Sequence, residues 1–270
     1  MKKFLTIFLP IIICLMIFGI NIKSNKTESQ RTNNINTKVS FYKNEYLNRY
    51  IDYKKKNKDL SIEKIILYVN IGIDQNFYTT TKNSPYKNTN YIIANKYYYL
   101  GKDYVPNNLE KIDSKYSINN GILVHDAKVE FEQMAKQAQK EGYTIRAIST
   151  YRSYDYQNRL YNNYIEKDGK QSADRYSARP GFSEHQTGLA VDVDNIKETY
   201  TNFGKTKEFI WMQENAYKYG FILRYTKETE FITGYLNEEW HYRYVGTNIS
   251  TYIHNNPMTY EEYFARFLDK

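Results

Sequence analysis

The chain has 270 residues, of which 38 are Lys or Arg and 30 are Asp or Glu, so its formal net charge is +8. Hydrophobic residues make up 41% and charged residues 25%, which excludes a wholly disordered or collagen-like chain. The single cysteine excludes an intramolecular disulfide framework and a zinc site built from several cysteines.

The positive charge is concentrated near the N-terminus. Residues 1–60 contain 12 Lys or Arg and 4 Asp or Glu, whereas residues 61–270 contain 26 of each. A nucleic-acid-binding domain usually carries its basic face within the folded part of the chain. The balanced charge of residues 61–270 therefore argues against a nucleic-acid partner.

The first 22 residues predict a membrane anchor. Lys2 and Lys3 precede an apolar run from Phe4 to Ile22, close to the ~20 residues that a helix needs to cross a bilayer. The run lacks a small-residue cleavage site, which favours an anchor over a cleaved secretory signal, the alternative interpretation. Residues 23–60, rich in Asn, Lys, Ser and Thr, then form a basic polar tether.

The remaining segments alternate between helical and strand patterns. Residues 64–72 are rich in β-branched side chains and end at a glycine, which predicts a strand. Apolar residues at spacings of four, three and four predict a helix over 123–140, and alternation predicts a strand over 144–150. Ser153 is the expected N-cap of the next helix.

The second half of the chain repeats this alternation after a polar loop at 168–184. Residues 187–194 alternate as a strand, and one apolar stripe over 205–219 predicts a helix that Gly220 ends. Further elements are predicted at 221–225 and 240–246 (strands) and from Thr259 to Leu268 (a helix with a capping box). The pattern predicts an α+β fold, with helices packed on a small, mainly antiparallel sheet.

Two histidines have neighbours that suggest a metal site. His185 precedes a strand that carries Asp192 and Asp194, and His241 begins another strand with Glu238 three residues before it. Two histidines and one carboxylate form a ligand set for catalytic zinc, and a further carboxylate nearby could serve as general base. On spacing alone, one histidine with a nearby aspartate is better interpreted as a hydrogen-bonded structural pair, and either aspartate could be the ligand.

Three sequence blocks, taken together, resemble a known family. They are Ser149-Thr-Tyr-Arg-Ser-Tyr154 followed by Gln157, then Ser183-Glu-His-Gln-Thr-Gly-Leu-Ala-Val-Asp192, then Glu238-Glu-Trp-His-Tyr-Arg-Tyr-Val-Gly246. In this order they resemble the VanY-type D-alanyl-D-alanine carboxypeptidases, zinc peptidases related to VanX dipeptidases and to LD-carboxypeptidases. The resemblance covers roughly residues 60–255.

The resemblance implies a role for each matching residue. His185, Asp192 and His241 would bind one zinc ion, Glu238 would be the catalytic base, and Arg152 would bind the substrate near the scissile bond. It also implies that three residues line the substrate pocket: Gln157, Ser183 and Trp240. Glu239, where the family commonly has a proline, is a rival for the base, but the family spacing points to Glu238.

The expected activity is therefore zinc-dependent removal of the C-terminal D-alanine from peptidoglycan stem peptides. An LD-carboxypeptidase that trims tetrapeptide stems is the main alternative, and a non-catalytic cell-wall binding protein is another. A peptidoglycan substrate requires the chain beyond residue 22 to lie outside the cytoplasm, anchored by residues 1–22 or secreted after cleavage. Residues 61–270 would form the peptidase domain, with a core at about 105–255.

Overall fold

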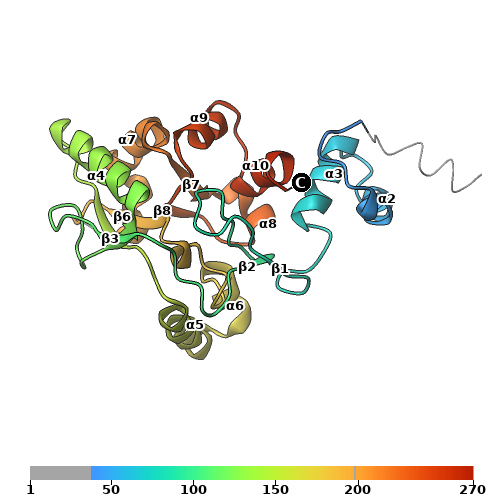
Figure 1. The fold of residues 1–270 in the computed structure, drawn as a ribbon, viewed down its shortest axis with the longest axis horizontal. Helices are drawn as coiled ribbons and strands as arrows, with labels where there is room; N and C mark the ends of the chain where they lie inside the picture. The colour runs from blue at the N-terminus through green and yellow to red at the C-terminus, as the bar shows by residue number, and fades with distance from the viewer. Residues whose placement is uncertain (1–37, 198, 270) are drawn as a thin grey trace, which may run out of the picture. The chain divides into compact units, whose positions relative to one another are not determined.

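The computed structural model describes residues 38–197 and 199–269 (Figure 1). The predicted membrane segment, 1–22, and part of the predicted tether lie outside the described residues. Within the described residues, no helix has both the length and the hydropathy that a membrane span needs. The chain divides into two compact units, one ending at Asn70 and the other beginning at Ile71.

The described part of the first unit, from residue 38 onward, is helical. After a short 3₁₀ turn at Asn44–Tyr46 come α2 (Leu47–Lys56) and α3 (Ile62–Ile71), which pack around the buried side chain of Tyr50. The strand predicted over 64–72 is wrong, because this segment is α3. A short apolar run buried on all sides fits a core strand and a core helix equally, so periodicity does not distinguish them.

A four-stranded sheet forms the centre of the second unit, in the order β5-β6-β8-β7 with every pair antiparallel. The strands are β5 (Arg146–Ser149), β6 (Ala190–Asp194), β7 (Phe221–Tyr225) and β8 (Glu238–Tyr244). This arrangement confirms the predicted α+β fold with a small antiparallel sheet. In the register of β6 and β8, Asp192 lies directly opposite His241.

Helices surround this sheet (Figure 1). On one face, α4 and α7 contribute Phe131 and Met212 to the core that also contains Val191 and Val193 of β6. Because side chains alternate along a strand, Asp192 points to the opposite face. The helices are α4 (His125–Lys140), α5 (Tyr154–Asp168), α6 (Lys170–Tyr176), α7 (Lys207–Asn215), α8 (Glu230–Thr233), α9 (Thr247–Asn255) and α10 (Tyr260–Phe267).

The helix ends follow the predicted capping. The Ser153 hydroxyl accepts a hydrogen bond from the Tyr156 amide at the start of α5, and Thr259 and Glu262 form the capping box of α10. Gly220 has a φ of +80° after the short 3₁₀ turn that follows α7, where a residue without Cβ is unstrained. The segment predicted as a loop at 168–184 instead contains α6, a two-turn helix too short and too polar to show a clear apolar stripe.

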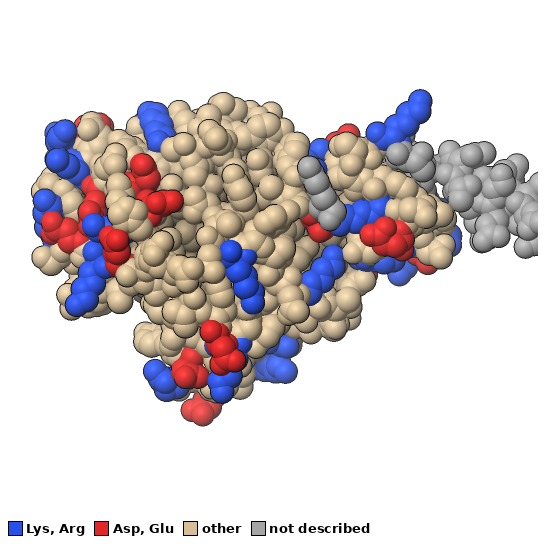
Figure 2. All heavy atoms as spheres, in the orientation of Figure 1, with Lys and Arg blue, Asp and Glu red and all other residues tan. Residues whose placement is uncertain are grey.

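Two small ribbons complete the second unit. The strands β1 (Lys82–Asn83) and β2 (Tyr98–Tyr99) pair in parallel, and β3 (Leu109–Lys111) and β4 (Ile122–Val124) pair antiparallel. On the face shown in Figure 2, acidic and basic side chains are mixed at the edge occupied by α4 and β3. This visible region presents no large patch of one charge.

Candidate active site

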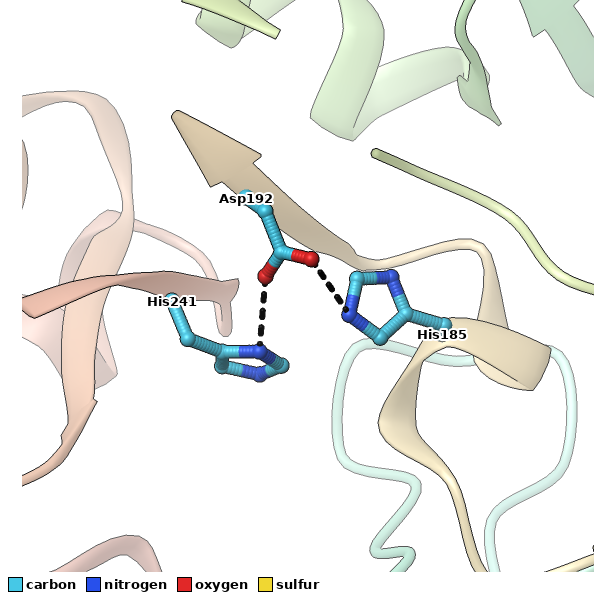
Figure 3. Close-up of side chains that lie close together, drawn as sticks. All are labelled: His185, Asp192 and His241. Atoms are coloured by element: carbon cyan, nitrogen blue, oxygen red, sulfur yellow. Dashed lines mark hydrogen bonds and ion pairs between the residues drawn. The ribbon is translucent and has the colours of Figure 1, made fainter. Parts of the chain in front are cut away.

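Three side chains converge on the sheet face opposite the main core (Figure 3). His185 comes from a 3₁₀ turn, Glu184–Thr187, Asp192 from β6 and His241 from β8, and one ligand atom of each lies within 4.8 Å of the others. Asp192 is central: its Oδ2 lies 3.3 Å from His185 Nε2, and its Oδ1 lies 3.0 Å from His241 Nδ1. The fold thus brings together the three residues expected to bind zinc.

The outer ring nitrogen of each histidine has its own partner. His185 Nδ1 lies 2.7 Å from the Thr150 carbonyl, and His241 Nε2 lies 3.1 Å from Glu184 Oε2. Because the carbonyl or carboxylate oxygen there accepts a hydrogen bond from a ring N–H, Nε2 of His185 and Nδ1 of His241 are the atoms left to face a metal. Two imidazole nitrogens and a carboxylate oxygen fit the three-ligand set of a catalytic zinc site.

The protonation of the two histidines differs because their neighbours differ. Burial and, to a smaller extent, the nearby Arg152 lower the pKa of His185 to about 4, so this ring is neutral at pH 7. Burial also lowers the pKa of His241, but hydrogen bonds to Asp192 and Glu184 outweigh it and raise the value to about 9. A metal ion bound at His241 Nδ1 would take the place of a proton, so metal binding here must release protons.

Glu238 stands beside these ligands, at the start of β8. Its Oε2 lies 3.7 Å from His241 Nδ1, and its side chain is 12% exposed. Burial raises the pKa of Glu238 to about 7, with His241 opposing and Asp192 adding to the shift. A carboxyl group whose pKa is near neutrality suits a general base.

The two rivals considered for these roles lie elsewhere. The Glu239 carboxyl packs against Gly204, where an added Cβ would lie only 2.1 Å from it, and Glu239 does not line the cavity described below. Asp194 accepts a hydrogen bond from the Asn195 amide and is outside the cluster of potential ligands. The geometry therefore favours Glu238 as the base and Asp192 as the ligand.

Arg152 reaches the same cluster from the segment between β5 and α5. Its Nη2 lies 2.7 Å from His185 Nε2 and 3.0 Å from Asp192 Oδ2, while Nη1 donates to Gln157 at 3.2 Å. Gln157 is itself fixed, since its amide donates to Ser177 and to the Ala178 carbonyl. The guanidinium is thus held at the wall of the site by Gln157 of α5 and by Ser149 of β5, whose hydroxyl accepts a hydrogen bond from Arg152 Nε at 3.0 Å.

A cavity of about 570 Å³ opens onto this cluster and is large enough for a peptide end. Trp240 contributes to its wall and contacts Tyr200 edge to face, with the ring centroids 5.0 Å apart. All of the residues expected to contact substrate line it, with aromatic side chains beside them: Arg152, Tyr156, Gln157, Tyr164, Ser183, Tyr200, Tyr225, Tyr235 and Trp240.

The comparisons with known proteins agree with this geometry. The family model for D-alanyl-D-alanine carboxypeptidase (VanY) matches residues 121–247. The bifunctional D-Ala-D-Ala dipeptidase and carboxypeptidase VanXYC of Enterococcus gallinarum is 32% identical over 63% of this chain and 91% of its own length. The chain belongs to the VanY family of D-alanyl-D-alanine carboxypeptidases.

Other similar proteins differ in length and named activity. The putative carboxypeptidase YodJ of Bacillus subtilis is 42% identical over 64% of this chain, and the chain spans 66% of that relative, just under two thirds. The LdcB LD-carboxypeptidase has a TM-score of 0.61 at 41% identity, covering 64% of this chain and 85% of that one. A zinc-bound point mutant of the vancomycin-resistance D,D-pentapeptidase VanY has a TM-score of 0.57 at 29% identity. The match covers 65% of this chain and 98% of that one.

Sequence reasoning missed a second group of charged residues behind His241. The sequence assigns no role to Glu184, yet its side chain is fully buried against two arginines, Arg224 and Arg243. The available signal was the presence of Arg224 within β7, a strand whose other residues are apolar or aromatic. A charge in such a strand is buried only when it is paired.

Proposed function

We propose that this chain is a zinc-dependent carboxypeptidase that removes the C-terminal D-alanine from peptidoglycan stem peptides. The observation that carries the proposal is the convergence of His185, Asp192 and His241 at one wall of a cavity, with Glu238 beside them. Family membership supports the same activity, because relatives with this name act on D-Ala-D-Ala.

Each residue at the cavity has a part in the hydrolysis. Zinc held by the three ligands would lower the pKa of a water toward neutrality and polarise the scissile carbonyl. Glu238 accepts the proton of the attacking water and then gives it to the amine of the departing D-alanine. No covalent bond between the enzyme and the peptide is required.

Arg152 supplies the positive charge at the cavity wall. The lone pairs of His185 Nε2 and Asp192 Oδ2 that it contacts are those a metal would use. If His185 and Asp192 held a metal, the Arg152 guanidinium donors would be free for a substrate oxygen. Arg152 can then stabilise either the developing oxyanion or the terminal carboxylate of the peptide.

Gln157, Ser183 and Trp240 complete the proposed substrate contacts. Gln157 holds Arg152, whereas Ser183 and Trp240 lie on the cavity wall. The aromatic pair of Trp240 and Tyr200 offers an apolar surface for the methyl groups of alanine residues.

A second candidate has an observation in its favour. LdcB, an LD-carboxypeptidase, is 41% identical to this chain with a TM-score of 0.61. The two activities share their chemistry and both release a terminal D-alanine. They differ in the residue that precedes it: a D-alanine for the D,D-carboxypeptidase, and a residue with an L-centre for the LD-carboxypeptidase. Trimming of tetrapeptide stems is therefore the alternative to D,D-carboxypeptidase activity.

The experiment that tests the proposal is mass spectrometry of purified penta- and tetrapeptide muropeptides after incubation with the protein. We expect zinc-dependent loss of one alanine from the pentapeptide. Loss from the tetrapeptide alone would assign the chain to the LD-carboxypeptidases. Loss from neither substrate would contradict both candidates and favour a cell-wall binding protein.

We also propose that the enzyme works outside the cytoplasm, with residues 1–22 as the anchor and the basic segment 23–60 as a tether. A stem peptide requires this location, and basic residues beside a membrane are attracted to anionic lipid. Fractionation of cells that express the full chain or residues 23–270 tests the anchor. The full chain should sediment with membranes, and recovery of both forms in the soluble fraction would contradict an anchor.

A further inference from the structure

The side of His241 away from the cavity ends on a buried carboxylate. His241 Nε2 and Glu184 Oε2 are 3.1 Å apart, and the Glu184 side chain has no exposed surface. Asp192 Oδ1 lies on the other side of the ring, 3.0 Å from Nδ1. The imidazole therefore lies between two carboxylates, only one of which belongs to the candidate metal ligands.

Glu184 is held in place by two arginines from neighbouring strands. Its Oε1 accepts hydrogen bonds from Arg224 Nε at 2.8 Å and from Arg243 Nη1 at 3.1 Å. Arg243 Nη2 also donates to the Ile92 carbonyl at 2.6 Å, so its donors on this side are occupied. Both arginine side chains are fully buried, which leaves Glu184 with little freedom to move.

The charges of Glu184, Arg224 and Arg243 are balanced only when α10 is included. Arg224 Nη1 and Nη2 donate to both carboxylate oxygens of Glu261, at 3.1 and 2.8 Å. Glu261 lies in the first turn of α10 and also accepts a hydrogen bond from Asn95 Nδ2 at 3.1 Å. Two carboxylates thus face two guanidiniums, and the second carboxylate comes from a helix outside the matched residues 121–247.

A metal-binding histidine needs its free ring nitrogen to be fixed. A carboxylate that accepts the other N–H sets the tautomer and the ring orientation, and its loss typically lowers metal affinity ~10- to 100-fold. Removing one member of a buried ion pair leaves its partner charged and unpaired. The position of Glu184 therefore depends on Arg224, and the position of Arg224 depends on Glu261.

We propose that Glu184 is a positioning residue for His241, and that α10 supports it through Glu261 and Arg224. The inference rests on the proposed zinc site. It extends the functional unit beyond the matched residues 121–247 to include a helix that contributes nothing to the cavity wall.

The first test measures metal affinity rather than turnover. Wild type, E184Q and E261Q are titrated with zinc against a competing chelator, and the visible absorption of each Co²⁺-loaded protein is recorded. The matched control is E208Q, because Glu208 is also buried but pairs with Asn195 instead of the arginines. We expect E184Q to lose about 10- to 100-fold in zinc affinity, E261Q to lose less, and E208Q to match wild type.

The Co²⁺ spectrum separates positioning from a merely structural role. If Glu184 sets the geometry of His241, E184Q should bind Co²⁺ with an altered ligand-field spectrum, while E208Q keeps that of wild type. An E184Q protein that loses stability but keeps wild-type zinc affinity and spectrum would contradict the inference. Failure of wild type to bind zinc would contradict the proposed function as well, so the two failures are distinguishable.

A second measurement needs no variant and decides the matter if E184Q does not fold. In the zinc-loaded wild-type protein, ¹⁵N NMR of the imidazoles reports which nitrogen of each ring carries a proton. We expect a protonated Nε2 on His241, hydrogen-bonded to Glu184, with Nδ1 bound to the metal. A metal-bound or unprotonated Nε2 on His241 would overturn the proposal.

Discussion

Two clusters of charged side chains meet at His241, one on each side of its ring. The cavity-side cluster contains Arg152, Asp192 and Glu238, whose side chains are 10–18% exposed. The rear cluster contains Glu184, Arg224, Arg243 and Glu261, whose side chains are at most 2% exposed. Both clusters contain carboxylates and arginines. They differ in burial and in how completely each carboxylate is paired with an arginine.

Because of this difference, a carboxyl group of the cavity-side cluster can take part in proton transfer, whereas the rear cluster keeps His241 in position. Burial raises the pKa of Glu238 to about 7, although the charges of His241 and Arg152 oppose the shift, so this carboxyl can exchange a proton near neutrality. Burial would also raise the pKa of Glu184, but Arg224 and the hydrogen bond from His241 hold it well below its ordinary value. Glu184 therefore stays ionised while Glu238 can gain and lose a proton.

Metal removal should have the largest effect, because it takes away the centre of the cavity-side cluster. We expect treatment with a strong chelator to reduce D-alanine release to background and added zinc to restore it. Assay of released D-alanine measures both steps. Activity that survives complete removal of metal would contradict the proposed mechanism.

Substitution of Glu238 should be next in size. E238Q keeps the shape of the side chain but cannot accept a proton, so kcat should fall by about 10²- to 10⁴-fold with zinc affinity retained. The adjacent E239Q is the matched control, because the Glu239 carboxyl packs against Gly204, away from the cavity. If E239Q lost activity and E238Q kept it, the roles of the two residues would be exchanged.

Two arginine variants compare the clusters directly. R224M leaves Glu184 and Glu261 buried without their shared partner, which should lower the free energy of unfolding by about 3–5 kcal/mol. R152M should lower it much less, since Arg152 lies at the cavity wall, but should reduce kcat/KM. Urea unfolding and kinetics of both variants measure these effects. Equal losses of stability would show that the clusters do not differ in the way described.

The smallest expected effect concerns an ion pair outside both clusters. Burial raises the pKa of Asp174, but hydrogen bonds from Arg179 and Tyr161 outweigh it and hold the value below normal. Ionised Asp174 therefore stabilises the folded protein at pH values above the unfolded-state pKa of about 4. This stabilisation is lost as the pH falls through the lower folded-state pKa. D174N should lower stability at pH 7 by about 1 kcal/mol or less.

The stability difference between D174N and wild type should shrink as the solution becomes more acidic. Urea unfolding at pH 7 and at pH 3 measures it. A difference that is equal at both pH values would show that ionised Asp174 does not stabilise the fold.

The sequence carried more information about the cavity side than about the rear cluster. The three matching blocks singled out His185, Asp192 and His241 because a metal site needs particular donors at fixed spacings. The register of β6 and β8 then places Asp192 opposite His241. The alternation in residues 187–194 also agrees with the structure, because Leu189, Val191 and Val193 all belong to the main core.

The rear cluster could not be predicted in the same way. Glu184, Arg224 and Glu261 come from a 3₁₀ turn, a strand and a helix that are distant in sequence, and only the tertiary fold brings them together. Local pattern also failed for α3, because its β-branched residues favour a strand while its burial in a helical unit favours a helix. In both cases the surroundings of a residue, rather than its neighbours in sequence, decided its structure.

One titration tests the central claim most directly. Metal-free protein is supplied with increasing zinc, and bound zinc and D-alanine release from a peptide ending in D-Ala-D-Ala are measured on the same samples. We predict that release rises in proportion to bound zinc and saturates at one ion per chain. Release by the metal-free protein, or a fully zinc-loaded protein that releases no D-alanine, would contradict the account.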